Sequence, residues 1–111
     1  MTITHIVLFQ FKSDVTPETI NDITERMLSL KECCVHPKTQ KQYIKASSGG
    51  IDNSPEGLQN GITHAFVVEF DSAADRDYYV NDDPKHREFV QRVGKSLEKA
   101  QVIDFTDGVF Q

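Results

Sequence analysis

The sequence lacks the features of membrane-spanning, secreted and nucleic-acid-binding proteins. No apolar run approaches the roughly 20 residues that cross a bilayer as a helix. The N-terminus lacks a basic start followed by an apolar core and a small-residue cleavage site. The 12 lysine and arginine residues, against 17 acidic ones, are scattered rather than gathered on one stripe, and the formal net charge is −5. We therefore expect a cytoplasmic protein with neither nucleic acid nor a membrane as a partner.

Cysteine is also scarce, and its placement argues against a disulfide or a metal site. Cys33 and Cys34 are adjacent, which is poor geometry for a structural disulfide. With His36 they form a cluster that lacks the ligand spacing of zinc sites. We expect ordinary thiols at a helix end and no bound metal.

What is present suits one folded unit. A chain of 111 residues falls within the range of single domains and can bury one core. The apolar fraction of 38% and the charged fraction of 26% are ordinary for globular proteins, and no internal repeat or low-complexity tract occurs. We expect a single domain over residues 1–111.

The hydrophobic pattern and the helix-capping residues predict the order of secondary structure. β-Branched and aromatic residues predict strands over residues 3–11, 42–46, 63–70 and 102–105. Thr16 followed by proline predicts a helix reaching about residue 34, and Ser72 and Asp83 predict the caps of a bent helix pair. Residues 47–57 are rich in glycine, serine and asparagine and predict a loop.

The order β-α-β-β-α-β is that of the ferredoxin-like α+β fold, a four-stranded antiparallel sheet with helices on one face. The first and third strands are apolar on both faces, so the face without helices also needs a cover. We expect a second copy of the chain to provide it, giving a homodimeric α/β barrel. The residues predicted to point away from the helices are Val7, Phe9, Phe66, Val68 and Phe70.

Three histidines and two tyrosines are candidates for chemistry. His5 and His64 fall among phenylalanines on one strand face, where each is either a hydrogen-bonded core residue or a ligand contact. His86 is the third residue of its predicted helix, where the helix dipole disfavours imidazolium. It is either a neutral proton acceptor in a pocket or a solvent-facing residue. Of Tyr78 and Tyr79, we expect one to orient His86 or bind an oxyanion and the other to pack.

Three stretches together resemble the stress-responsive dimeric α/β-barrel (Dabb) family: residues 4–9 (THIVLF), 61–67 (GITHAFV) and 77–89 (DYYVNDDPKHREF). The resemblance to the plant polyketide cyclases of that family implies that this protein catalyses an intramolecular aldol closure of a hydrophobic poly-β-keto thioester without any cofactor. The resemblance places the general base on His86 and an assisting phenol on Tyr78. The predicted substrate-binding residues are His5, Val7, Phe9, Ile23, Met27, His64, Phe66 and Phe89.

This sequence also departs from the cyclases. Asp83 stands where they have a histidine before the proline, with one extra residue separating it from Tyr78, and Met27 stands where they have a pocket tyrosine. We therefore expect a different pocket shape. Two other functions remain open: a non-catalytic, stress-linked dimer that binds a small ligand, and a cofactor-free monooxygenase or isomerase of the same fold.

Overall fold

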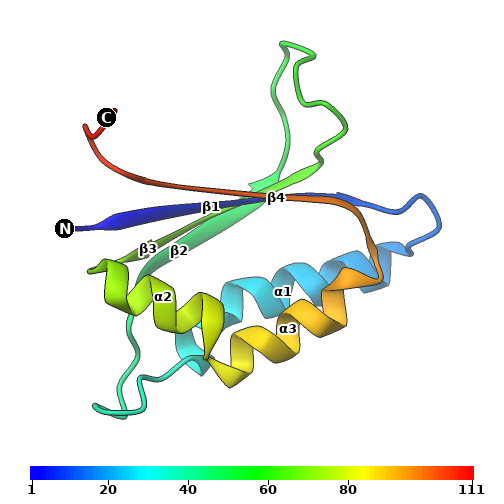
Figure 1. Cartoon of the computed structure of the whole chain (residues 1–111). Helices are drawn as coiled ribbons and strands as arrows, with labels where there is room; N and C mark the ends of the chain where they lie inside the picture. Colours follow the sequence, from blue (N-terminus) through cyan, green and yellow to red (C-terminus); the bar gives the residue numbers. More distant parts are fainter.

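The computed structural model describes residues 1–111 as one four-stranded sheet with three helices. The elements are β1 (Ile3–Phe11), α1 (Pro17–Cys33), β2 (Ile44–Ile51), β3 (His64–Phe70), α2 (Ala73–Asn81), α3 (Pro84–Gly94) and β4 (Leu97–Thr106). The strand order is β2-β3-β1-β4, and all neighbours are antiparallel. Figure 1 shows all three helices on one side of the sheet, with the loop between β2 and β3 rising on the other. The predicted ferredoxin-like α+β fold is confirmed.

The three predicted helix caps are present and set where the helices begin. The hydroxyl of Thr16 accepts a hydrogen bond from the backbone N–H of Thr19, and that of Ser72 accepts from the N–H of Asp75. Asp83 caps α3 in the same way. Such caps satisfy N–H groups that have no partner inside the helix. The cap between α2 and α3 divides the second helical segment in two, as predicted.

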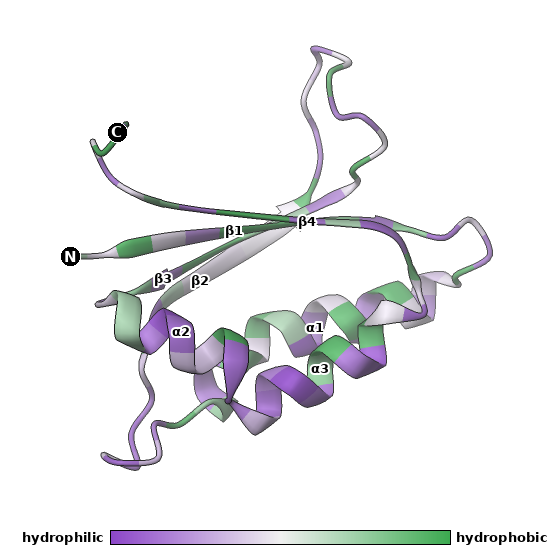
Figure 2. Cartoon of the chain, in the orientation of Figure 1, coloured by the Kyte–Doolittle hydropathy of each residue, from purple (hydrophilic) through white to green (hydrophobic).

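The helices cover the sheet face that we predicted to lie open. Val7, Phe9, Phe66, Val68 and Phe70 are all buried in the core, with Ile23, Met27 and Leu30 of α1 packed among them. The prediction was wrong because strand alternation shows that two faces differ but not which one a helix crosses. Figure 2 shows hydrophobic stretches along β1 although helices cover only one of its sides.

The face without helices, called the open face below, is therefore the opposite one. It carries apolar side chains from three adjacent strands, all of them half-buried or exposed. These are Ile6, Leu8, Ala65, Val67, Ile103 and Phe105. An apolar stripe on a sheet that no helix covers is typical of an interaction surface.

Two strands are longer than predicted. β2 continues to Ile51, through serine and glycine residues that we expected in a loop, because its backbone pairs with β3 as far as His64. Gly49 is needed in this pairing, since a Cβ there would lie 2.3 Å from Cδ1 of Phe66. β4 begins already at Leu97, whereas we predicted this strand from residue 102. Cross-strand pairing, which lies outside the local sequence, decided both boundaries.

Candidate active site

A cavity of about 690 Å³ opens between the sheet and the helix pair, on the side of the edge strand β4. Its wall comes from β1, α2, α3 and β4, with Met27 of α1, and is mainly apolar. Val80, Val90 and Val102 line it while remaining 41%, 49% and 54% exposed, so the cavity is open to solvent. This volume and this lining are typical of small-molecule sites.

Six of the ten predicted site residues line this cavity: His5, Val7, Phe9, Met27, His86 and Phe89. Ile23 and Phe66 are instead buried in the core. His64 shares the sheet face of His5 but lies at the far end of β3, where its ring packs on Phe11. Burial lowers the pKa of His64.

The tyrosine in the cavity is Tyr79, and the predicted Tyr78 lies outside it. The Tyr78 ring packs against His36 and Tyr43, with centroid distances of 5.3 and 5.5 Å. Neighbouring residues of a helix point about 100° apart, so only one of the two can face the sheet. Tyr79 is almost fully buried, and its ring lies 4.0 Å from that of His86 and 5.9 Å from that of His5.

Asp83 positions His86 at the start of α3. One carboxylate oxygen of Asp83 accepts hydrogen bonds from the backbone N–H groups of Lys85 and His86, at 2.9 and 3.3 Å. Its other oxygen accepts one from the hydroxyl of Tyr43. The Asp83 side chain is 1% exposed, so these bonds hold a buried carboxylate. The first turn of α3, and with it the His86 imidazole, is thereby fixed against the sheet.

The environment of His86 favours its neutral form. Burial is the main cause and the nearby His5 adds to it, and together they lower the pKa of His86 to about 4. The backbone of Tyr79 and the charge of Asp83 act in the opposite direction, more weakly. Nδ1 of His86 is buried without a hydrogen bond of acceptable geometry. At neutral pH the cavity therefore holds an uncharged imidazole that can take up a proton.

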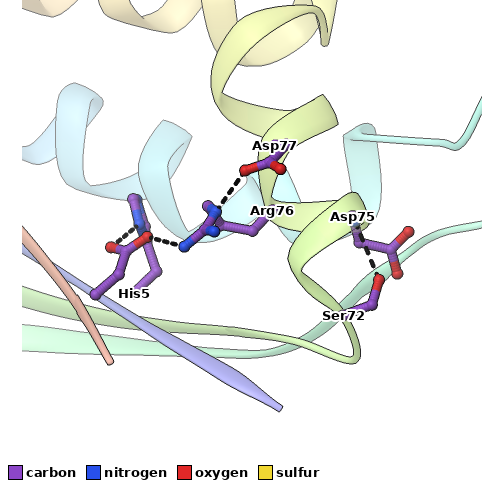
Figure 3. A network of polar contacts seen from close by, with 6 residues as sticks. His5, Ser72, Asp75, Arg76 and Asp77 are labelled. Carbon is purple, nitrogen blue, oxygen red and sulfur yellow. Dashed lines mark hydrogen bonds and ion pairs between the residues drawn. The ribbon is translucent and has the colours of Figure 1, made fainter. Parts of the chain in front are cut away.

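His5 belongs to a chain of hydrogen-bonded polar groups that we did not predict from the sequence. Its Nδ1 donates to Oδ1 of Asp104 at 2.6 Å, and Oδ2 of Asp104 accepts from Arg76 at 2.9 Å. Nε of Arg76 donates to Asp77 at 2.8 Å, and Figure 3 shows His5, Arg76 and Asp77 along this network. Because an ionised carboxylate only accepts, Nδ1 of His5 carries a proton, and the other ring nitrogen has no protein partner.

A signal for this network was present in the sequence. Asp104 is an acidic residue within an apolar strand prediction, and such a residue demands a partner when the strand is covered. The partner became evident only from the register, which sets Asp104 directly opposite His5.

The two cysteines form no disulfide. Cys33 is exposed and Cys34 is buried, and both are free thiols. Burial and then the Asp83 carboxylate raise the pKa of Cys34, which keeps it a protonated thiol. No three His, Cys, Asp or Glu side chains are arranged to hold a metal ion. None of the helices has the length and apolar character needed to span a membrane.

Comparison with known proteins agrees with this fold. A family model, the stress-responsive A/B barrel domain (Dabb), matches residues 3–107. The stress-response A/B barrel domain-containing protein HS1 of Arabidopsis thaliana is 34% identical over 101 residues, covering 91% of this chain and 85% of that protein.

Solved structures are similar over nearly the whole chain. Arabidopsis thaliana At3g17210 superposes with a TM-score of 0.83 at 30% identity, covering 98% of both chains. A hydroxynitrile lyase from Passiflora edulis gives 0.84 at 25% identity, covering 99% of this chain and 97% of that one. A dimeric ferredoxin-like protein from Thermobifida fusca shares the fold, with 0.74 at 22% identity and 96% and 91% covered. The chain therefore belongs to the Dabb family of stress-responsive A/B barrel domains.

Proposed function

We propose that this protein is a cofactor-independent enzyme that makes or breaks a carbon–carbon bond in an apolar carbonyl compound, with His86 as general base. The observation that carries the proposal is the neutral, half-buried imidazole of His86 in the wall of a mainly apolar cavity, close to the paired His5. A titratable group with a strongly shifted pKa in such a cavity is typical of an active site.

The preferred reaction is the aldol closure of a β-keto thioester, as in the polyketide cyclases that the sequence resembles. A carbon between two carbonyl groups is acidic, so imidazole can remove its proton. The resulting enolate carbon attacks a ketone carbon of the same chain, a C–C bond forms, and the protonated His86 returns its proton to the new alkoxide. A pKa of about 4 makes His86 a weak base in the empty cavity. The negative charge of an enolate beside it favours its protonated form, which offsets this weakness.

The assisting phenol in this proposal is Tyr79 rather than Tyr78. Tyr79 faces the cavity and lies against His86, whereas Tyr78 does not line it. Burial raises the pKa of Tyr79, so its hydroxyl stays protonated and is available as a donor to a developing oxyanion.

Cyanohydrin cleavage is a second candidate, favoured by the similarity to the Passiflora edulis hydroxynitrile lyase. There the same base would take the proton of the hydroxyl group, and a carbonyl would form as the bond to the cyanide carbon breaks. The protonated His86 would then return its proton to the released cyanide, giving hydrogen cyanide. Both reactions require that His86 take up one proton and that the cavity hold one neutral, mainly apolar molecule.

We also propose that the protein is a homodimer joined through the open face. Its half-buried and exposed apolar residues lie side by side on β1, β3 and β4. The similar Thermobifida fusca protein is dimeric. Burying this stripe against a second copy would remove its apolar surface from water while leaving the cavity, on the helix side, accessible.

The test is turnover by the wild-type protein, His86→Ala and the matched exposed control Lys85→Ala. Each is assayed with synthetic β-keto thioesters, following cyclised product by mass spectrometry, and with mandelonitrile, following benzaldehyde by absorbance. We expect wild-type turnover in one assay, a loss of at least about 100-fold in kcat/KM for His86→Ala, and none for Lys85→Ala. Circular dichroism verifies folding.

Retained activity in a folded His86→Ala protein would exclude His86 as the base. Binding of these compounds without turnover by the wild-type protein would instead support the non-catalytic, ligand-binding alternative. Oxygen consumption with a phenolic substrate would support a monooxygenase.

A further inference from the structure

The cavity contains a cation whose charge is already compensated. Arg76 is the only lysine or arginine that lines it. Its guanidinium donates to Asp104 at 2.9 Å and to Asp77 at 2.8 Å, and both carboxylates also line the cavity. Apart from the two histidines, the wall thus carries one positive and two negative charges. Figure 3 shows Arg76 between His5 and Asp77, with its side chain directed along this network.

These charges determine what the cavity can accept. A carboxylate that leaves water needs an unpaired cation or several hydrogen-bond donors, because burying an uncompensated charge is strongly unfavourable. Arg76 is already paired with Asp77 and Asp104, and burial keeps His86, in the same cavity wall, neutral. A second anion would instead meet the excess negative charge of the wall. An uncharged molecule brings no charge to this wall, and it can pack on the apolar surface and form hydrogen bonds with His5 and His86.

We propose that the cavity takes uncharged carbonyl compounds and rejects the corresponding carboxylates, and that the pairing of Arg76 with Asp77 and Asp104 sets this preference. This inference deepens the proposed function, on which its meaning for catalysis rests, by naming the substrate class. Ketones, esters and thioesters are accepted, whereas free keto acids are not. The reaction that supplies the substrate must therefore deliver it with its acid group absent or esterified.

A binding experiment tests this without requiring turnover. The probes are 4-pentylacetophenone and 4-pentylbenzoate at neutral pH, which have nearly the same shape and differ in charge. Dissociation constants are measured by calorimetry, and chemical-shift changes at Val90 and Val102 verify that a probe occupies the cavity. We expect the ketone to bind at least about tenfold more tightly than the benzoate, equivalent to about 1.4 kcal/mol.

Two variants of α2 connect the preference to Arg76. Asp77→Asn removes one of its carboxylate partners, and the Asp77 side chain is 61% exposed, so the fold should tolerate the change. Asp75→Asn is the control, because it removes the same charge from the same helix but Asp75 does not line the cavity. We expect Asp77→Asn to reduce the preference for the ketone, given as the Kd of the benzoate divided by the Kd of the ketone, at least about threefold. Asp75→Asn should leave this preference unchanged.

Equal binding of the two probes, tighter binding of the benzoate, or no binding of the ketone would each overturn the proposal. If Asp77→Asn and Asp75→Asn changed the preference for the ketone equally, the role of Arg76 would be overturned, because general surface charge would then explain the preference. Ketone binding without turnover of any substrate would refute the proposed function alone and leave this inference standing.

Discussion

The neutral state of His86 can be tested through stability, independently of any substrate. The perturbation is His86→Gln, which keeps a polar side chain of similar length at the third position of α3, where glutamine is well tolerated. His86 has a pKa of about 4 in the folded protein, whereas its ordinary value is 6.5. The unfolded chain therefore binds a proton at a higher pH than the folded one.

The sign and size of the effect follow from this difference. Above about pH 6.5 neither state is protonated at His86, and the group leaves stability unchanged. As the pH falls toward about 4, protonation of the unfolded chain lowers the free energy of unfolding by about 1.4 kcal/mol per unit. Between about pH 7.5 and 5 the full effect is about 2 kcal/mol, and we expect about 1 kcal/mol because the side chain is only half-buried.

The assay is urea unfolding of the wild type and His86→Gln at about pH 7.5 and 5, followed by circular dichroism. Wild type should lose about 1 kcal/mol more than the variant over this range, because other titrating groups contribute equally to both proteins. Gln91→Ala, an exposed change on the same helix, should follow the wild type. An equal loss in wild type and His86→Gln would show that His86 is not held neutral, and the reasoning on its burial would be refuted.

Two further predictions concern the hydrogen bond to Asp83 and the dimer. Tyr43→Phe leaves the buried Asp83 carboxylate without its hydroxyl donor. We therefore expect the free energy of unfolding, measured by urea titration, to fall by about 1–3 kcal/mol. An unchanged value would show that the hydrogen bond from Tyr43 does not stabilise the fold. Val67→Lys places a charge at the centre of the open face, and we expect light scattering to show half the wild-type mass, while Gln91→Lys on α3 keeps the dimer. A monomeric wild type would contradict the dimer proposal.

The helix starts and the element order could be predicted from the sequence because their causes are local. A cap acts over two or three residues, so Thr16, Ser72 and Asp83 could be recognised without any tertiary information. Counting from Asp83 was also enough to put His86 at the third position of α3, near the positive end of the helix dipole. The strand core of residues 3–11 was equally plain from its composition, and β1 has those bounds.

Only the tertiary structure decided which sheet face the helices cover, which tyrosine enters the cavity, and which acid pairs with His5. Alternation along a strand is symmetric between the faces until a helix packs on one of them. Asp104 meets His5 across 99 residues of sequence, through a register that the whole sheet sets. The same long-range packing, rather than anything beside it in the chain, buries His86 and keeps it neutral. The sequence alone thus determined the elements and one candidate base, whereas contacts between distant segments determined the cavity around it.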